Sequence, residues 1–206
     1  MKTTTHFGFL LVAVFAASAQ IASSAEPTKS TQAEIVMKAS FKDRGQAKVD
    51  RLNQDETQRL CSKYPDKRPA EIGKKIEGIN MKLMKYPADG KLLGDWKEGE
   101  KIAQSGVGKQ FSDDPSRPAG GNCYACHQLS KEEISFGNIG PSLYNFGKLR
   151  GNTEATQKYT FGKIYNAEAY AACSNMPRFG HNGILTEEQI KHVTALLLDP
   201  NSPVNK

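Results

Sequence analysis

The residues with the most specific chemistry are Cys123, Cys126 and His127, which occur in the run Cys-Tyr-Ala-Cys-His. Two cysteines separated by two residues and followed at once by histidine form the attachment signature of a c-type haem. The two thiols add to the two vinyl groups of the porphyrin, and the adjacent imidazole reaches the iron from the same face. We therefore expect one covalently bound haem c, with Cys123 and Cys126 as its anchors and His127 as the proximal ligand.

Two other kinds of site use closely spaced cysteines, and both fit less well. A thioredoxin-like dithiol requires a strand leading into the motif, whereas a glycine-rich loop precedes Cys123. A zinc site requires further ligands at compact spacing, which the sequence lacks. The haem interpretation is therefore preferred.

The sixth iron ligand decides whether a haem protein carries electrons or activates small molecules. The candidates are Met37, Met81, Met84, Met176, His181 and His192. Met81 and Met84 lie among apolar positions and are expected in the core. His192 is expected on the solvated face of the last helix.

Met176 is the favoured sixth ligand because it lies in a non-helical run, Ser-Asn-Met-Pro, shortly before the last helix. Pro177 keeps residue 176 extended and stiffens the loop, so that a thioether can point steadily at the iron. The alternatives are that His181 binds the iron or that the position is open. Histidine and methionine ligation would leave no site for a substrate, so such a haem passes single electrons.

A second contact with His127 is expected from the segment Gly140-Pro141-Ser142-Leu143. A backbone carbonyl there could accept the other ring N–H of His127 and fix its tautomer, as is usual around a histidine ligand. We expect Pro141 to supply this carbonyl. An ordinary turn is the alternative.

The chain divides into three predicted parts. Residues 1–25 form a secretory signal peptide, because Lys2 precedes an apolar run that ends in small residues. Residues 26–93 form an N-terminal helical extension, with helices over 46–60 and 69–83. Residues 94–206 form a class I cytochrome c-like haem domain, so the predicted fold is all-α.

The clearest helix of the haem domain is the last one. Thr186 and Gln189 form a capping box, and an apolar face follows until Pro200. Asp95 is expected to cap a helix that runs to about Ser105. Further helical patterns and one loop are predicted over 123–129, 153–159, 161–170 and, for the loop, 106–122.

The net charge and the predicted export limit the classes of function that fit this chain. The chain has 206 residues with 28 Lys and Arg against 22 Asp and Glu, and loss of the signal removes only Lys2 from this count, so the mature net charge is +5. Basic residues form no stripe with aromatic ones, so we expect no nucleic-acid binding and rather an acidic protein partner. No segment after the signal is apolar enough to span a membrane. A periplasmic protein is expected.

Cys61 and Cys173 form an even remainder once the haem motif is assigned. In an exported protein such a remainder predicts a disulfide. It would tie the extension to the loop that carries Met176. The alternative is that Cys173 is a free thiol that handles sulfur compounds near the haem.

The C-terminal part, residues 93–206, resembles the SoxX family, the monohaem cytochrome subunit of the SoxAX thiosulfate-oxidising complex. The extension looks like that of the longer SoxX variants. The resemblance rests on the runs Gly121-Asn122-Cys123 to His127, Gly140-Pro141-Ser142-Leu143, Lys163-Ile164-Tyr165-Asn166 and Asn175-Met176-Pro177-Arg178-Phe179-Gly180.

The resemblance implies that the family's haem-binding positions are Cys123, Cys126, His127 and Met176 here. It further implies a periplasmic heterodimer with a SoxA-type cytochrome subunit, in which thiosulfate is joined to a cysteine of a SoxYZ-type carrier. The complex would be an L-cysteine S-thiosulfotransferase, and this subunit would accept electrons and pass them to a downstream acceptor. No nucleophile and base pair is visible in this chain, so no catalytic residue is expected in it.

Two other functions remain open. A free-standing periplasmic electron-carrier cytochrome c would share every haem feature but would need no dedicated partner surface. A haem enzyme would have an open distal position. The extension favours the subunit function, because a carrier gains little from about 68 extra residues.

Overall fold

The computed structural model describes residues 32–206, so the predicted signal peptide lies outside the described residues. The chain divides into two units between Ser40 and Phe41. The described part of the first unit is helix α1 (Gln32–Ser40). Between residues 32 and 206, no helix has both the length and the apolar character needed to cross a bilayer.

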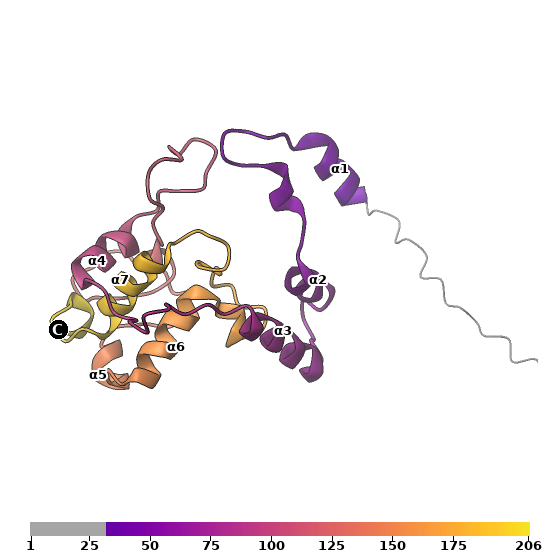
Figure 1. Ribbon diagram of the computed structural model, residues 1–206. Helices are drawn as coiled ribbons and strands as arrows, with labels where there is room; N and C mark the ends of the chain where they lie inside the picture. The colour runs from indigo at the N-terminus through magenta and orange to yellow at the C-terminus, as the bar shows by residue number, and fades with distance from the viewer. Residues whose placement is uncertain (1–31) are drawn as a thin grey trace, which may run out of the picture. The chain divides into compact units, whose positions relative to one another are not determined.

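Helices make up the regular structure of residues 32–206, where the only bridge between extended segments joins Arg44 to Ala47. The predicted all-α fold is therefore confirmed (Figure 1). The helices of the second unit are α2 (Glu56–Lys63), α3 (Ala70–Lys82), α4 (Trp96–Gln104), α5 (Phe146–Arg150), α6 (Glu154–Tyr165) and α7 (Glu187–Leu198). Short 3-10 turns are η1 (Val49–Leu52), η2 (Cys123–Ala125), η3 (Ala167–Ala169) and η4 (Pro203–Asn205).

In the extension, the single helix predicted over 46–60 is wrong. The turn η1 ends at Leu52, and α2 begins only after Asp55. The Asp55 carboxylate accepts the N–H of Gln58, and the Gln58 side chain accepts the N–H of Asp55. Because an N-cap residue has an extended backbone, no helix runs through it. The helix predicted over 69–83 is confirmed as α3.

In the C-terminal part, both predicted helix starts are confirmed. Asp95 caps α4 by accepting the N–H of Lys97 at 2.8 Å. Thr186 and Gln189 form the expected capping box of α7, with each side chain accepting the other residue's N–H. These caps depend only on residues three positions apart or fewer, which is why the sequence reveals them.

The remaining helical patterns are only partly right. The pattern over 123–129 yields one turn, η2, because the chain returns against it: Gly137 donates its N–H to the Tyr124 carbonyl at 2.8 Å. The patterns over 153–159 and 161–170 belong to the single helix α6 and the turn η3. Helix α5 has no counterpart among the predicted elements.

Helices α4 and α7 pack closely over the core. A Cβ at Gly99 of α4 would overlap the backbone carbonyl of His192, so only glycine permits this approach. The Nδ1 of His192 accepts the N–H of Asp95 at 2.8 Å, and its side chain is only 20% exposed. The predicted solvated position of His192 is therefore wrong. The fully buried residues of these two helices and of the core that they cover include Ala103, Leu129, Phe161, Ile190, Leu196 and Val204.

Candidate functional site

The attachment motif is presented by a glycine-rich segment that lies against the end of α4. Gly121 donates its N–H to the Ile102 carbonyl at 2.8 Å, and Asn122 donates to the Ser105 carbonyl at 2.9 Å. A Cβ at Gly120 would overlap the Ser105 backbone. These contacts hold the start of η2, and hence Cys123, against the helical core.

The two cysteines of the motif are unbonded, and their environment does not suit thiol redox chemistry. Burial raises the pKa of the Cys123 thiol to about 12. A redox-active dithiol requires a thiolate with a lowered pKa. A thiol that stays protonated does not serve as the nucleophile of a redox-active dithiol, so the surroundings of Cys123 argue against the thioredoxin-like interpretation.

The imidazole of His127 is oriented by the backbone that follows the motif. Its Nδ1 lies 2.7 Å from the carbonyl oxygen of Pro141, which is the expected contact. With the Nδ1 proton donated to this carbonyl, the Nε2 lone pair is left for a metal. A Cβ at Gly140 would overlap the imidazole ring, so the backbone touches the ring directly.

The segment that carries Pro141 is itself held by backbone hydrogen bonds. Gly140 donates its N–H to the Cys126 carbonyl at 2.9 Å, and Leu143 donates to the Gln128 carbonyl at 2.8 Å. The histidine and its carbonyl partner therefore belong to one hydrogen-bonded unit. Together with the two unbonded thiols, this donor set fits a covalently attached haem.

Met176 lies in a segment without helix between η3 and α7. It is half-buried and packs against the same core cluster as Cys123 and Ile184. Its N–H donates to the Ser174 hydroxyl at 3.1 Å. The residue thus lies beside the core that the attachment motif borders, and its assignment as the iron ligand stays a prediction.

The other ligand candidates lie in different surroundings. Met81 is 45% exposed near the end of α3, so its predicted core position is wrong, while Met84 is half-buried. Met37 belongs to α1 in the first compact unit. His181 is half-buried; burial and the nearby charge of Arg178 lower its pKa.

Cys61 and Cys173 form the predicted disulfide, with their Cα atoms 5.5 Å apart. The alternative, a free Cys173 thiol, is therefore wrong. The bond joins α2 of the extension to the residue three positions before Met176.

Two charged residues near Met176 have no signal in the sequence. Arg178 is buried, at 7% exposed, and its Nη2 lies 2.6 Å from Oδ2 of Asp55. Glu168 is also buried and accepts the N–H of Cys173 at 2.6 Å; burial raises the pKa of its carboxyl group. The spacing of Asp55 and Gln58 is a recognisable cap signal, but sequence alone does not indicate which arginine or glutamate is buried.

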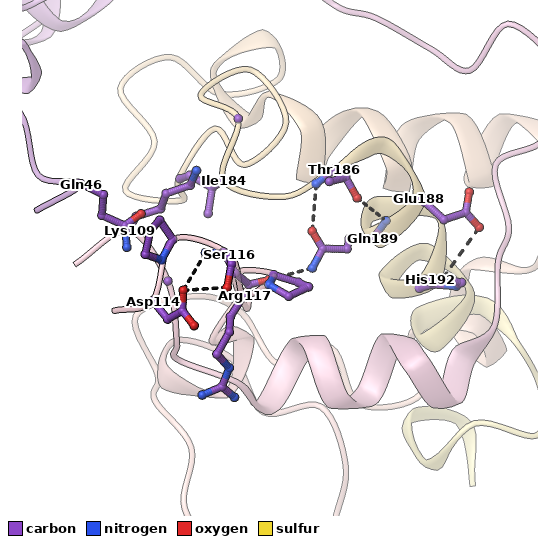
Figure 2. Close-up of a pocket in the computed structure, with 15 residues that line it drawn as sticks. Gln46, Lys109, Asp114, Ser116, Arg117, Ile184, Thr186, Glu188, Gln189 and His192 are labelled. Carbon is purple, nitrogen blue, oxygen red and sulfur yellow. Dashed lines mark hydrogen bonds and ion pairs between the residues drawn. The ribbon is translucent and has the colours of Figure 1, made fainter. Parts of the chain in front are cut away.

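A cavity of about 470 Å³ lies apart from the haem motif. Figure 2 shows it between the loop of residues 108–119 and the start of α7, where the Gln189 amide donates to the Ala119 carbonyl at 2.7 Å. None of Cys123, Cys126, His127 and Met176 lines it. The cavity is therefore not the site indicated by the sequence.

Comparison with known proteins agrees with this geometry. The sequence model described as cytochrome c matches residues 97–199, a span that contains the attachment motif and Met176. An uncharacterized lipoprotein of Aquifex aeolicus (strain VF5) is 35% identical over 211 residues, which covers 97% of this chain and 99% of that protein. The chain therefore belongs to the cytochrome c family of electron-transfer proteins, whose members carry covalently bound haem c.

Proposed function

We propose that this chain is a periplasmic cytochrome that binds one haem c through Cys123 and Cys126, with His127 and Met176 as the iron ligands. The observation that carries the assignment is the hydrogen bond of 2.7 Å between His127 Nδ1 and the Pro141 carbonyl, beside two unbonded thiols. This bond selects the ring nitrogen that faces a metal. When bound, a haem with histidine and methionine ligands supplies one-electron redox chemistry.

The residues around the motif fix the imidazole and pack against the Cys123 side chain. The Pro141 carbonyl orients the imidazole, and Gly140 keeps the backbone in contact with it. Core residues including Leu129 and Leu185 belong to the buried apolar cluster against which Cys123 packs. Ligands that keep the same positions in both oxidation states need little rearrangement, which favours electron transfer.

We propose further that the chain is the electron-accepting subunit of a SoxAX-type complex. Joining thiosulfate to a cysteine thiol through a new sulfur–sulfur bond releases two electrons and one proton. This subunit, with its single haem, takes up these electrons one at a time and passes the first to the downstream acceptor before it receives the second. Similarity of residues 93–206 to SoxX supports this role. The likeness to the Aquifex protein extends over the extension as well, because it covers 97% of the chain.

Export is supported by the signal-like first 25 residues and by the name of the relative, which is called a lipoprotein. The chain also contains a disulfide, which joins Cys61 to Cys173. Disulfides persist in oxidising compartments such as the periplasm, in line with this location.

The test of the subunit role is gentle purification from periplasm followed by size exclusion. We expect a second haem protein to co-elute at one-to-one stoichiometry. The two proteins together should form thiosulfate adducts on a carrier cysteine. A monomer that exchanges electrons but forms no such adduct would instead indicate a free-standing electron carrier.

The ligand assignment has its own test. Met176→Ala should abolish the sulfur-to-iron charge-transfer band of the oxidised protein while the haem stays attached through Cys123 and Cys126. Survival of the band would show that Met176 is not the ligand.

A further inference from the structure

The feature that the cytochrome c family assignment leaves unexplained is the extension. Its helices α2 and α3 approach residues 172–178, here called the methionine segment, on both sides of Met176. Among the described residues, no backbone N–H of this segment donates to a backbone carbonyl. It is held by side chains, by one disulfide and, at its last residue, by the Asn182 N–H, which donates to the Arg178 carbonyl at 2.9 Å.

The N-terminal half of the methionine segment is held at two consecutive residues. Arg68 donates from Nη2 to the Ala172 carbonyl at 2.9 Å, and the Ala172 N–H donates to Glu77 Oε1 at 3.3 Å. The next residue, Cys173, is bonded to Cys61. Both polar groups of the Ala172 backbone are thus satisfied by the extension.

Cys173 adopts a backbone conformation that requires support. Its φ is +60°, a left-handed value that residues other than glycine rarely adopt. Such conformations persist where surrounding contacts hold them. Here the contacts are the disulfide and the hydrogen bond from the Cys173 N–H to buried Glu168.

The C-terminal half is joined to the extension by an ion pair. Arg178 is 7% exposed, and its guanidinium lies 2.6 Å from Asp55, the N-cap residue of α2. A buried guanidinium that loses its carboxylate partner is left with an unpaired charge, which is strongly unfavourable. The pair therefore fixes Arg178, two residues beyond Met176, to the start of α2.

Helices α2 and α3, which carry these contacts, are themselves held by packing and hydrogen bonds. Ile76 of α3 is fully buried, and the Asn80 amide donates to Thr57 Oγ1 of α2 at 2.8 Å. The Asn166 amide, at the end of α6, donates to Asn80 Oδ1 at 3.1 Å. Helices α2 and α3 are thereby joined to each other and to the core beside the methionine segment.

We propose that Asp55, Cys61, Arg68 and Glu77 of the extension are positioning residues that hold Met176 in place as the distal ligand. The inference rests on the proposed function, in which Met176 binds the iron. A loop held at both ends opens rarely, so an external ligand seldom finds the distal position vacant. These four residues, here called the clamp, thus keep the site six-coordinate.

The test is the affinity of imidazole for the oxidised holoprotein, which measures how often the distal position opens. Asp55→Ser removes the carboxylate that reaches Arg178 but keeps a good N-cap residue on α2. Glu56→Ser is the matched control, because Glu56 is adjacent and its ion pair, with Lys75, lies at the surface. We expect imidazole to bind Asp55→Ser on the order of tenfold more tightly than the wild type, because a buried charge pair is broken, and Glu56→Ser to bind it unchanged.

A second variant keeps the proposal falsifiable if Asp55→Ser folds poorly. Cys61→Ala with Cys173→Ala removes the other anchor, and it too should tighten imidazole binding. Urea unfolding of each variant separates this local effect from general loss of stability. Equal imidazole affinities in the wild type, Asp55→Ser and the double cysteine variant would overturn the clamp.

Failure of the proposed function would look different. Met176→Ala should bind imidazole most tightly of all and lack the charge-transfer band. If Met176→Ala keeps the band, the ligand assignment is wrong. If it loses the band while the anchor variants behave like the wild type, the ligand is right and the clamp is wrong.

Discussion

The two sides of the proposed haem site are held by different kinds of interaction. On the proximal side, residues 120–143 are fixed by backbone hydrogen bonds, and the partner of His127 lies only 14 positions away. On the distal side, the extension holds the methionine segment through side chains and a disulfide whose partners lie 95 to 123 positions away, beside one near contact from the Cys173 N–H to Glu168. The proximal side is local, whereas the distal side depends on a separate part of the chain.

The two sides of the proposed haem site therefore differ in how sensitive they are to amino-acid substitution. Backbone hydrogen bonds survive most substitutions, because every residue except proline offers the same groups. Anchors made by individual side chains are lost by single substitutions. We therefore expect the distal side to be the more easily disturbed, and the following changes test this in order of expected size.

Removal of the disulfide should have the largest effect. Cys61→Ala with Cys173→Ala should lower the free energy of unfolding by about 2–5 kcal/mol, because the bond restricts the unfolded chain. Urea unfolding of the oxidised holoprotein measures the change. Haem content should stay at one per chain, since Cys123 and Cys126 are untouched. An unchanged urea midpoint would show that the disulfide contributes nothing to the distal side.

A substitution on the proximal side should come next. Gly140→Ala places a methyl group in the space of the His127 ring, and overpacking of this kind costs about 1–3 kcal/mol. The yield of covalently bound haem per chain and the urea midpoint should both fall. Gly78→Ala is the control, because nothing lies within 4 Å of its added methyl group. Equal haem yields in the two variants would contradict the close contact with His127.

A substitution outside the proximal residues 120–143 and the methionine segment should lower stability without changing the imidazole affinity. Thr186→Ala removes the cap of α7 and should cost about 1 kcal/mol. The urea midpoint should fall, but the imidazole affinity of the oxidised protein should stay at the wild-type value. A tighter imidazole complex in this variant would mean that general destabilisation, rather than the clamp, opens the distal side.

Acid should act on the distal side with a smaller effect. Burial disfavours the charged form of Asp55, but the N–H of Gln58 and the Arg178 guanidinium outweigh it and lower its pKa. The stability that this pair contributes is therefore full above the unfolded pKa of about 3.9 and is lost as the pH falls through the lower folded value. Urea midpoints between pH 6 and pH 2, an interval of about 4 units around that value, should fall less steeply in Asp55→Ser than in the wild type. Parallel curves would remove Asp55 from the acid response.

Much of the fold was predictable because its signals are local. The caps at Asp95 and Thr186 involve neighbours within one helical turn, and α3 and α7 follow from apolar spacing. The helix over 46–60 failed because the cap at Asp55 outweighs the apolar pattern around it. The helix over 123–129 failed because a segment from 137–140 pairs with the motif, and such a return is not encoded in local spacing.

Haem attachment through Cys123, Cys126 and His127 was predictable from sequence, because the types and close spacing of these residues form the signature without help from the fold. The sequence also indicated the Cys61–Cys173 bond, because only two cysteines were left to pair. The tertiary structure alone decided that Arg178 is buried against Asp55 and that Arg68 and Glu77 hold Ala172. The physical reason is that contacts between residues about a hundred positions apart are set by how helices pack, and no local pattern records which charged side chain that packing will enclose.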